Sequence, residues 1–149
     1  MKKKLFWSPA VFLMAFPFVH PFGAVKQQHA PSQLATDAAV FALLERACLN
    51  CHSQQTQWPI YSYLPPLSWA IEKDVADARQ HMDFSRWNVY SADEKRDLLA
   101  RIGSEVRTSQ MPLPRYLLLH PEARLSKEER QVIYEWTKTQ RRALRNERE

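Results

Sequence analysis

The chain has 149 residues and a formal net charge of +5, and only two of its residues are cysteine. A chain of this length fits one domain and is too short for two sizeable cores. The positive charge is concentrated at the two ends, because residues 26–137 contain 13 basic and 14 acidic side chains. This near-neutral central region argues against a nucleic-acid-binding protein.

The N-terminus has the pattern of an export segment. Three lysines near the start precede an uncharged, mostly apolar stretch over residues 5–19. A basic start followed by an apolar run is typical of a signal peptide, with a cleavage site here after Ala24. The bulky Phe22 disfavours that cleavage, and the apolar run with its flanks approaches the ~20 residues that span a bilayer. We therefore expect residues 1–24 to be a signal peptide or a retained membrane anchor, and the polar residues 25–35 to be a linker.

The rest of the chain, residues 36–149, predicts one all-α domain of about four helices. The first helix is expected to start with Thr36 as its N-cap and to lead directly into the cysteine motif, and the second starts near Leu67. Two stretches rich in proline and aromatic residues, 54–68 and 109–125, are expected to form ordered loops.

Two further helices begin at capping boxes, formed by Ser91 with Glu94 and by Ser126 with Glu129. Each of the four helices has an apolar face at helical spacing. These faces consist of Ala38, Phe41, Leu44 and Ala47; Ile71, Val75, Ala78 and Met82; Leu98, Leu99, Ile102 and Val106; and Val132, Ile133 and Trp136.

Both cysteines fall in one Cys-x-x-Cys-His motif, Cys48, Cys51 and His52, which is the attachment signature of c-type haem. Thiols three residues apart at a helix end project from nearly the same face, so each can bond one vinyl group of the same porphyrin. The histidine that follows lies under the ring, within reach of the iron. Two other uses stay open. The thiols can form a disulfide or a thiol-redox site, or they can hold zinc together with His52 and either His81 or His120.

A sixth iron ligand must come from elsewhere in the chain. We predict Met111, because a thioether on a stiff proline-rich loop can approach the open face of the ring, and His/Met ligation raises the reduction potential. His81 and His120 are the alternatives and would give bis-histidine ligation. Met82 lies on the apolar face of its helix and is expected to be part of the core.

Several aromatic residues near the motif are candidates for the wall of a haem pocket. Arg79 is a candidate partner for a haem propionate, since its guanidinium matches a carboxylate. A plain aromatic core and an exposed helix arginine would explain the same residues. The aromatic candidates are Trp58, Tyr61, Trp69 and Trp87.

Three blocks of sequence, residues 48–69, 74–87 and 111–130, resemble the small haem-binding domains of bacterial exported proteins, a branch of the cytochrome c-like group. The motif residues and the run CLNCHSQQTQWPIYSYLPPLSW carry the first match, and MPLPRYLLLHPEARLSKEER carries the third. The resemblance implies a small cytochrome c-like helical domain around one covalently bound haem c. It also implies thioethers at Cys48 and Cys51, His52 as axial ligand and Met111 as sixth ligand.

These observations predict an exported monohaem c-type cytochrome that carries single electrons between periplasmic or membrane redox partners. We expect it in the periplasm, either soluble or attached to the outer face of the inner membrane through its N-terminal segment or its basic C-terminal tail. One alternative is a haem sensor or a peroxidase-like enzyme with a displaceable sixth ligand. Another is an interaction module that uses the cysteines as a disulfide or a zinc site.

Overall fold

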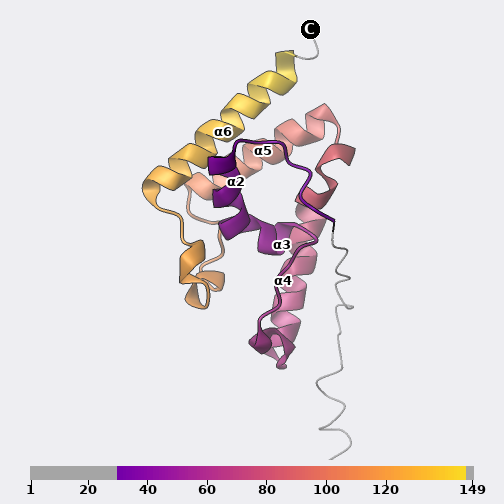
Figure 1. Cartoon of the computed structure of the whole chain (residues 1–149), viewed down its shortest axis with the longest axis vertical. Helices are drawn as coiled ribbons and strands as arrows, with labels where there is room; N and C mark the ends of the chain where they lie inside the picture. The colour runs from indigo at the N-terminus through magenta and orange to yellow at the C-terminus, as the bar shows by residue number, and fades with distance from the viewer. Residues whose placement is uncertain (1–29, 147–149) are drawn as a thin grey trace, which may run out of the picture.

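The computed structural model describes residues 30–146, which form helices joined by ordered loops and contain no strand (Figure 1). The all-α prediction is therefore confirmed for this part of the chain. The export segment predicted over residues 1–24 lies outside the described residues. Between residues 30 and 146, no helix combines the length and the apolar character that a membrane span requires. The elements in chain order are α2 (Ala38–Leu44), η2 (Glu45–Leu49), α3 (Asn50–His52), η3 (Ile60–Tyr63), α4 (Leu67–His81), η4 (Phe84–Val89), α5 (Ala92–Arg107), η5 (Tyr116–Leu118), η6 (Pro121–Ala123) and α6 (Lys127–Asn146).

The first helical segment runs from α2 through η2 into α3 and carries the cysteine motif at its end. Its predicted N-cap, Thr36, is wrong. The helix begins one residue later than a cap at Thr36 would give, and the Asp37 carboxylate accepts a hydrogen bond of 2.9 Å from the Val40 backbone N–H. Asp37 has the extended backbone conformation of a cap residue, so Asp37 and not the adjacent Thr36 is the N-cap.

The last two long helices, α5 and α6, pack along each other and form the largest helix–helix contact (Figure 1). Both start at the predicted capping boxes. They approach closely at Gly103, where an added Cβ would lie 2.6 Å from Thr137 Oγ1. This position therefore needs glycine. Ile133 and Trp136 of α6 point into the core as predicted, but Val132 does not, because it is 44% exposed and Thr137 takes the inward position.

The core lies between this helix pair and the segment that carries the motif. Leu44, Phe84, Leu99 and Ile133 are at most 1% exposed and join elements that are distant in the sequence. The predicted linker has no helix or strand from residue 30 onward. Its end runs along η4, where the Gln33 backbone N–H donates a hydrogen bond of 3.0 Å to the Phe84 carbonyl.

Candidate functional site

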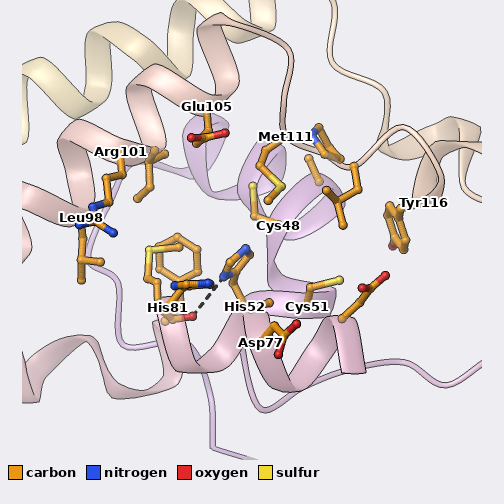
Figure 2. A pocket seen from close by; sticks show the side chains of 18 of the residues that line it. Cys48, Cys51, His52, Asp77, His81, Leu98, Arg101, Glu105, Met111 and Tyr116 are labelled. Carbon is orange, nitrogen blue, oxygen red and sulfur yellow. Dashed lines mark hydrogen bonds between the residues drawn. The ribbon is translucent and has the colours of Figure 1, made fainter. Parts of the chain in front are cut away.

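A cavity of about 420 Å³ opens in front of the cysteine motif, within the usual size range of cofactor pockets (Figure 2). It is enclosed by α3, α4, α5 and the loop that follows α5. Most of its wall is apolar, with charged side chains among the remainder. The apolar and aromatic lining residues are Ala47, Ala78, Met82, Phe84, Leu98, Ile102, Met111, Pro112, Leu113 and Tyr116.

The motif delivers Cys48, Cys51 and His52 to this cavity from one helical segment. Cys48 lies in η2, a π-helical turn, whereas Cys51 and His52 lie in α3. A π turn widens a helix locally, and such turns are frequent at functional sites. Figure 2 shows both sulfur atoms and the imidazole ring facing the same space. The structure therefore brings the three motif residues together, as the spacing predicts.

Both thiols are held in the protonated form. Burial, together with a smaller effect of Cys51, raises the pKa of Cys48 to about 12. Burial and, to a lesser degree, Asp74 raise the pKa of Cys51 to about 11, against the opposing effect of Arg79. A thiol-redox site or a zinc site uses the thiolate, so these environments do not favour either alternative. Moreover, no group of three or more His, Cys, Asp or Glu side chains within residues 30–146 is placed to hold a metal ion.

His52 is oriented by a backbone carbonyl. Its Nδ1 lies 3.1 Å from the Met82 carbonyl oxygen. Because a carbonyl can only accept, Nδ1 carries the proton and donates it. Burial lowers the pKa of His52, so the ring is neutral near pH 7 and Nε2 keeps a free lone pair. A hydrogen bond of this kind on the far nitrogen is the usual support of a histidine that binds a metal.

Met111 lines the same cavity from the loop after α5, so the predicted fifth and sixth ligands face one space (Figure 2). The structure distinguishes Met111 from Met82 and His120, but not from His81. Met82 and His81 also line the cavity, but Met82 belongs to the backbone segment that supports His52. His120 is not a cavity-lining residue, and its two ring nitrogens contact Tyr61 and Glu122. The ligand role of Met111 stays a prediction.

A polar network holds the chain directly behind the motif. Arg79 donates hydrogen bonds of 2.8 Å from Nε to the Ser53 carbonyl and from a terminal nitrogen to Thr56 Oγ1. Thr56 in turn donates to the Asn50 carbonyl at 2.7 Å, and Ser53 Oγ donates to the Leu49 carbonyl at 2.7 Å. Ser53 and Thr56 are buried. The network fixes the end of α3, and with it the position of His52.

The aromatic residues proposed for the pocket wall, and Arg79, are not among the residues that line the cavity. Tyr61 contacts His120 through its hydroxyl, and Trp87 packs in the core with Phe84 at a ring separation of 5.8 Å. Trp58 and Trp69 are half-buried. The structure thus gives these assignments no support, and contact of these residues with haem stays a prediction.

The sequence analysis did not predict the charged residues that line the cavity. Arg101 and Glu105 reach the cavity from α5, in the same helix face as Leu98 and Ile102 (Figure 2). Asp74, Asp77 and Arg115 also line it. Arg115 binds Asp74 through two hydrogen bonds of 2.9 and 2.7 Å. No local sequence pattern distinguishes these charged side chains from those of a solvent-exposed helix face.

The chain that follows Met111 is tied to the rest of the fold at two points, once to α3 and once to η3. Asn50 Nδ2 donates a hydrogen bond of 3.0 Å to the Tyr116 hydroxyl. Further along, the Tyr61 hydroxyl lies 2.5 Å from His120 Nε2, and the rings of Tyr116 and His120 stack at 4.2 Å. These contacts hold the two walls of the cavity at a fixed separation.

The residues present fit a haem. Two thiols, one imidazole with a free Nε2 and one thioether border a largely apolar cavity of suitable size. Comparisons with curated proteins and with solved structures gave no match. The profile of the Haem-binding domain family matches residues 11–139, which is most of the chain. The chain therefore belongs to the haem-binding domain family.

Proposed function

We propose that the protein is an exported monohaem c-type cytochrome that carries single electrons between partners on the periplasmic side of the membrane. In this proposal the haem is bound covalently at Cys48 and Cys51, and His52 and Met111 are its iron ligands. The observation that carries the proposal is that all four side chains line one cavity although Met111 is 59 residues beyond His52 in the sequence.

The chain contributes binding, orientation and exclusion of water. The two thiols hold the haem edge, and the Met82 carbonyl keeps Nε2 of His52 directed into the cavity. The apolar wall limits access of water to the iron. When bound, the haem supplies one-electron chemistry of its iron, and ligation by histidine and methionine raises the reduction potential. Because His52 and Met111 would both bind the iron, this arrangement favours electron transfer over catalysis on a bound substrate.

Covalent attachment is tested by producing the protein in cells with c-type maturation machinery and recording the pyridine haemochrome spectrum after acid-acetone extraction. We expect a c-type band that survives extraction. Loss of the band in the Cys48→Ala/Cys51→Ala variant, with retention in a variant altered outside the motif, assigns the attachment. A colourless wild-type protein from cells that mature a control cytochrome contradicts the proposal.

The sixth ligand is tested with two matched methionine substitutions. Met111→Leu and Met82→Leu both conserve side-chain volume within the same cavity, so their packing costs are similar. We expect Met111→Leu to convert a six-coordinate low-spin spectrum into one with an open position and to lower the reduction potential. Met82→Leu should leave the coordination unchanged. An unchanged six-coordinate low-spin spectrum in Met111→Leu would contradict the assignment of Met111 and point to His81, His120 or Met82.

Export is tested by cell fractionation. We expect the haem-containing protein outside the cytoplasm, in the periplasm or on the outer face of the inner membrane. Washing membranes with salt and with carbonate separates adhesion through charged residues from an anchor retained at residues 1–24. Recovery of the holoprotein in the cytoplasm contradicts this part of the proposal.

A further inference from the structure

A second cavity lies between the start of α5 and the end of α6, and its lining is entirely basic. It has a volume of about 370 Å³. We call it the basic cleft. Its lining residues are Arg96, Lys138, Arg141, Arg142 and Arg145. It shares no lining residue with the cavity at the cysteine motif.

Most of this positive charge is not neutralised by neighbouring side chains. Only two of the five basic side chains of the cleft form an ion pair with a carboxylate. Asp93 pairs with Arg96 at 2.7 Å, and Glu135 pairs with Lys138 at 2.9 Å. Within the part of the chain that the structure describes, the other three arginines have no ion pair. Residues 138–146 contain no acidic side chain at all. A ligand with several negative charges would therefore find unoccupied partners.

The helix dipole does not account for this cluster. Cations in the last turn of a helix are stabilised by the dipole, which explains Arg145. Lys138 and Arg141 lie before the last turn, and Arg96 belongs to another helix. Like charges three and four residues apart repel each other and destabilise the helix slightly. Such a cluster on two helices, enclosing a cavity, is typical of a site for phosphate or carboxylate groups.

The path of the N-terminal chain indicates which kind of anionic ligand lies near the basic cleft. The Ala30 carbonyl accepts a hydrogen bond of 3.0 Å from Ser85 Oγ, and Gln33 Oε1 accepts one of 3.1 Å from the Asn88 N–H. The chain therefore enters the fold along η4, directly before α5. Five residues separate Ala30 from Ala24, the end of the predicted signal peptide or anchor. The chain between these two residues can span at most about 22 Å.

An apolar N-terminal run in or on a bilayer would thus hold the start of α5 close to the lipid surface. The end of α6 lies beside the start of α5, so the cleft belongs to this part of the molecule (Figure 1). We propose that the basic cleft docks the protein onto an anionic membrane surface, with lipid phosphate groups bound between α5 and α6. The separate haem cavity stays free for a redox partner. This proposal does not depend on covalent haem attachment.

The test is sedimentation of the full-length holoprotein with vesicles of phosphatidylcholine alone and of phosphatidylcholine mixed with phosphatidylglycerol. Insertion of an apolar segment occurs in both, so the difference between them reports the contribution of charge. Each arginine near an anionic surface increases partitioning by roughly fivefold. We therefore expect Arg142→Gln/Arg145→Gln to reduce the charge-dependent partitioning by about 30-fold.

The matched control is Arg124→Gln/Lys127→Gln, which removes the same charge from exposed residues outside the cleft. We expect little change in this variant. An equal loss in both variants, or no preference of the wild type for anionic vesicles, overturns the proposal. Haem absorption and helical circular dichroism verify that the variants are folded. As a measurement that needs no variant, raising the salt from 0.1 to 1 M shortens the screening length from about 10 to about 3 Å and should abolish the preference.

A probe of a different class separates a lipid surface from an acidic protein. Poly-glutamate presents carboxylates on a polypeptide instead of phosphates on a bilayer. We expect it to compete weakly with the anionic vesicles at equal charge concentration. If the cleft substitutions abolish binding of poly-glutamate and leave vesicle binding unchanged, the cleft faces a protein and the membrane proposal is overturned.

Discussion

The role of Arg79 is the sharpest point at which the structure and the sequence lead to different expectations. As a propionate partner, Arg79 would act on the haem. In the structure its guanidinium instead donates to the Ser53 carbonyl and to Thr56 Oγ1, both at 2.8 Å. We predict that Arg79→Met, which keeps the apolar stem of the side chain, destabilises the fold.

The magnitude follows from the groups that lose a partner. The Ser53 carbonyl belongs to a fully buried residue, and an orphaned buried acceptor costs about 1–3 kcal/mol. Thr56 Oγ1 keeps its hydrogen bond to the Asn50 carbonyl, so the loss of its bond from Arg79 costs less free energy. Because Arg79 is only half-buried, solvent offsets part of the loss of the charged donor. We expect the free energy of unfolding to fall by about 2–3 kcal/mol. Arg79→Lys should cost less, since one ammonium can still reach one acceptor.

The assay is urea unfolding of the holoprotein, followed by tryptophan fluorescence and by haem absorption. Arg124→Met serves as the control, because Arg124 is exposed and such changes stay within about 0.5 kcal/mol. The reduction potential is measured on the same variants as a function of pH. A stability of Arg79→Met equal to that of the control, combined with a changed pH dependence of the potential, would refute the structural role and support the propionate contact.

Three further predictions concern the packing and the caps. Gly103→Ala should lower the free energy of unfolding, measured in thermal melts, by about 1–2 kcal/mol, because the added methyl group clashes with Thr137 and the clash exceeds the gain in helix propensity. Unchanged stability would contradict this. Adding Thr137→Ala to the variant should relieve the loss. Tyr61→Phe should loosen the loop that carries Met111 and increase the high-spin fraction in the ferric spectrum; an unaltered spectrum under mild denaturant would contradict this. The hydrogen bonds that the Glu94 carboxylate accepts from Ser91 lower its pKa below the usual 4.5. Its contribution to the free energy of unfolding is therefore present above pH 4.5 and is lost as the pH falls through its pKa in the folded protein. Glu94→Gln should flatten the acid side of the profile of stability against pH, and an equally steep profile would contradict this.

Local signals in the sequence predicted the helices well where one pattern dominates. The capping boxes at Ser91 and Ser126 are formed as predicted, because both partners lie within one turn. At the start of α2 two cap-type residues are adjacent, and periodicity alone does not choose Asp37 over Thr36. Val132 is exposed although it fits the apolar period of α6. Thr137 takes the inward position opposite Gly103 of α5, and such a contact depends on both helices.

In the candidate site as well, the sequence predicted the features that depend on local spacing and missed those that depend on helix packing. The proposed covalent attachment of haem demands a fixed spacing, so the motif is visible in the sequence. The cavity wall depends on how α5 lies against the motif segment, and no local pattern indicates that Arg101 and Glu105 reach it. The aromatic residues near the motif were therefore assigned by proximity in sequence. Tyr61 does not line the cavity, since its hydroxyl contacts His120, and its contact with haem stays a prediction.

The two sides of the cavity are restrained to different degrees, and this bears on how the site can change its function. His52 lies at the end of one continuous helical segment and is fixed by a backbone carbonyl and by the network behind the motif. Met111 lies in a loop that is held by hydrogen bonds from Asn50 of α3 to Tyr116 and between Tyr61 of η3 and His120. The methionine itself is several residues away from both ties. A substitution or a partner that breaks these ties would thus release the sixth position before the fifth. In this fold an electron carrier would acquire an open coordination site through its loop, while the attachment of the haem stayed intact.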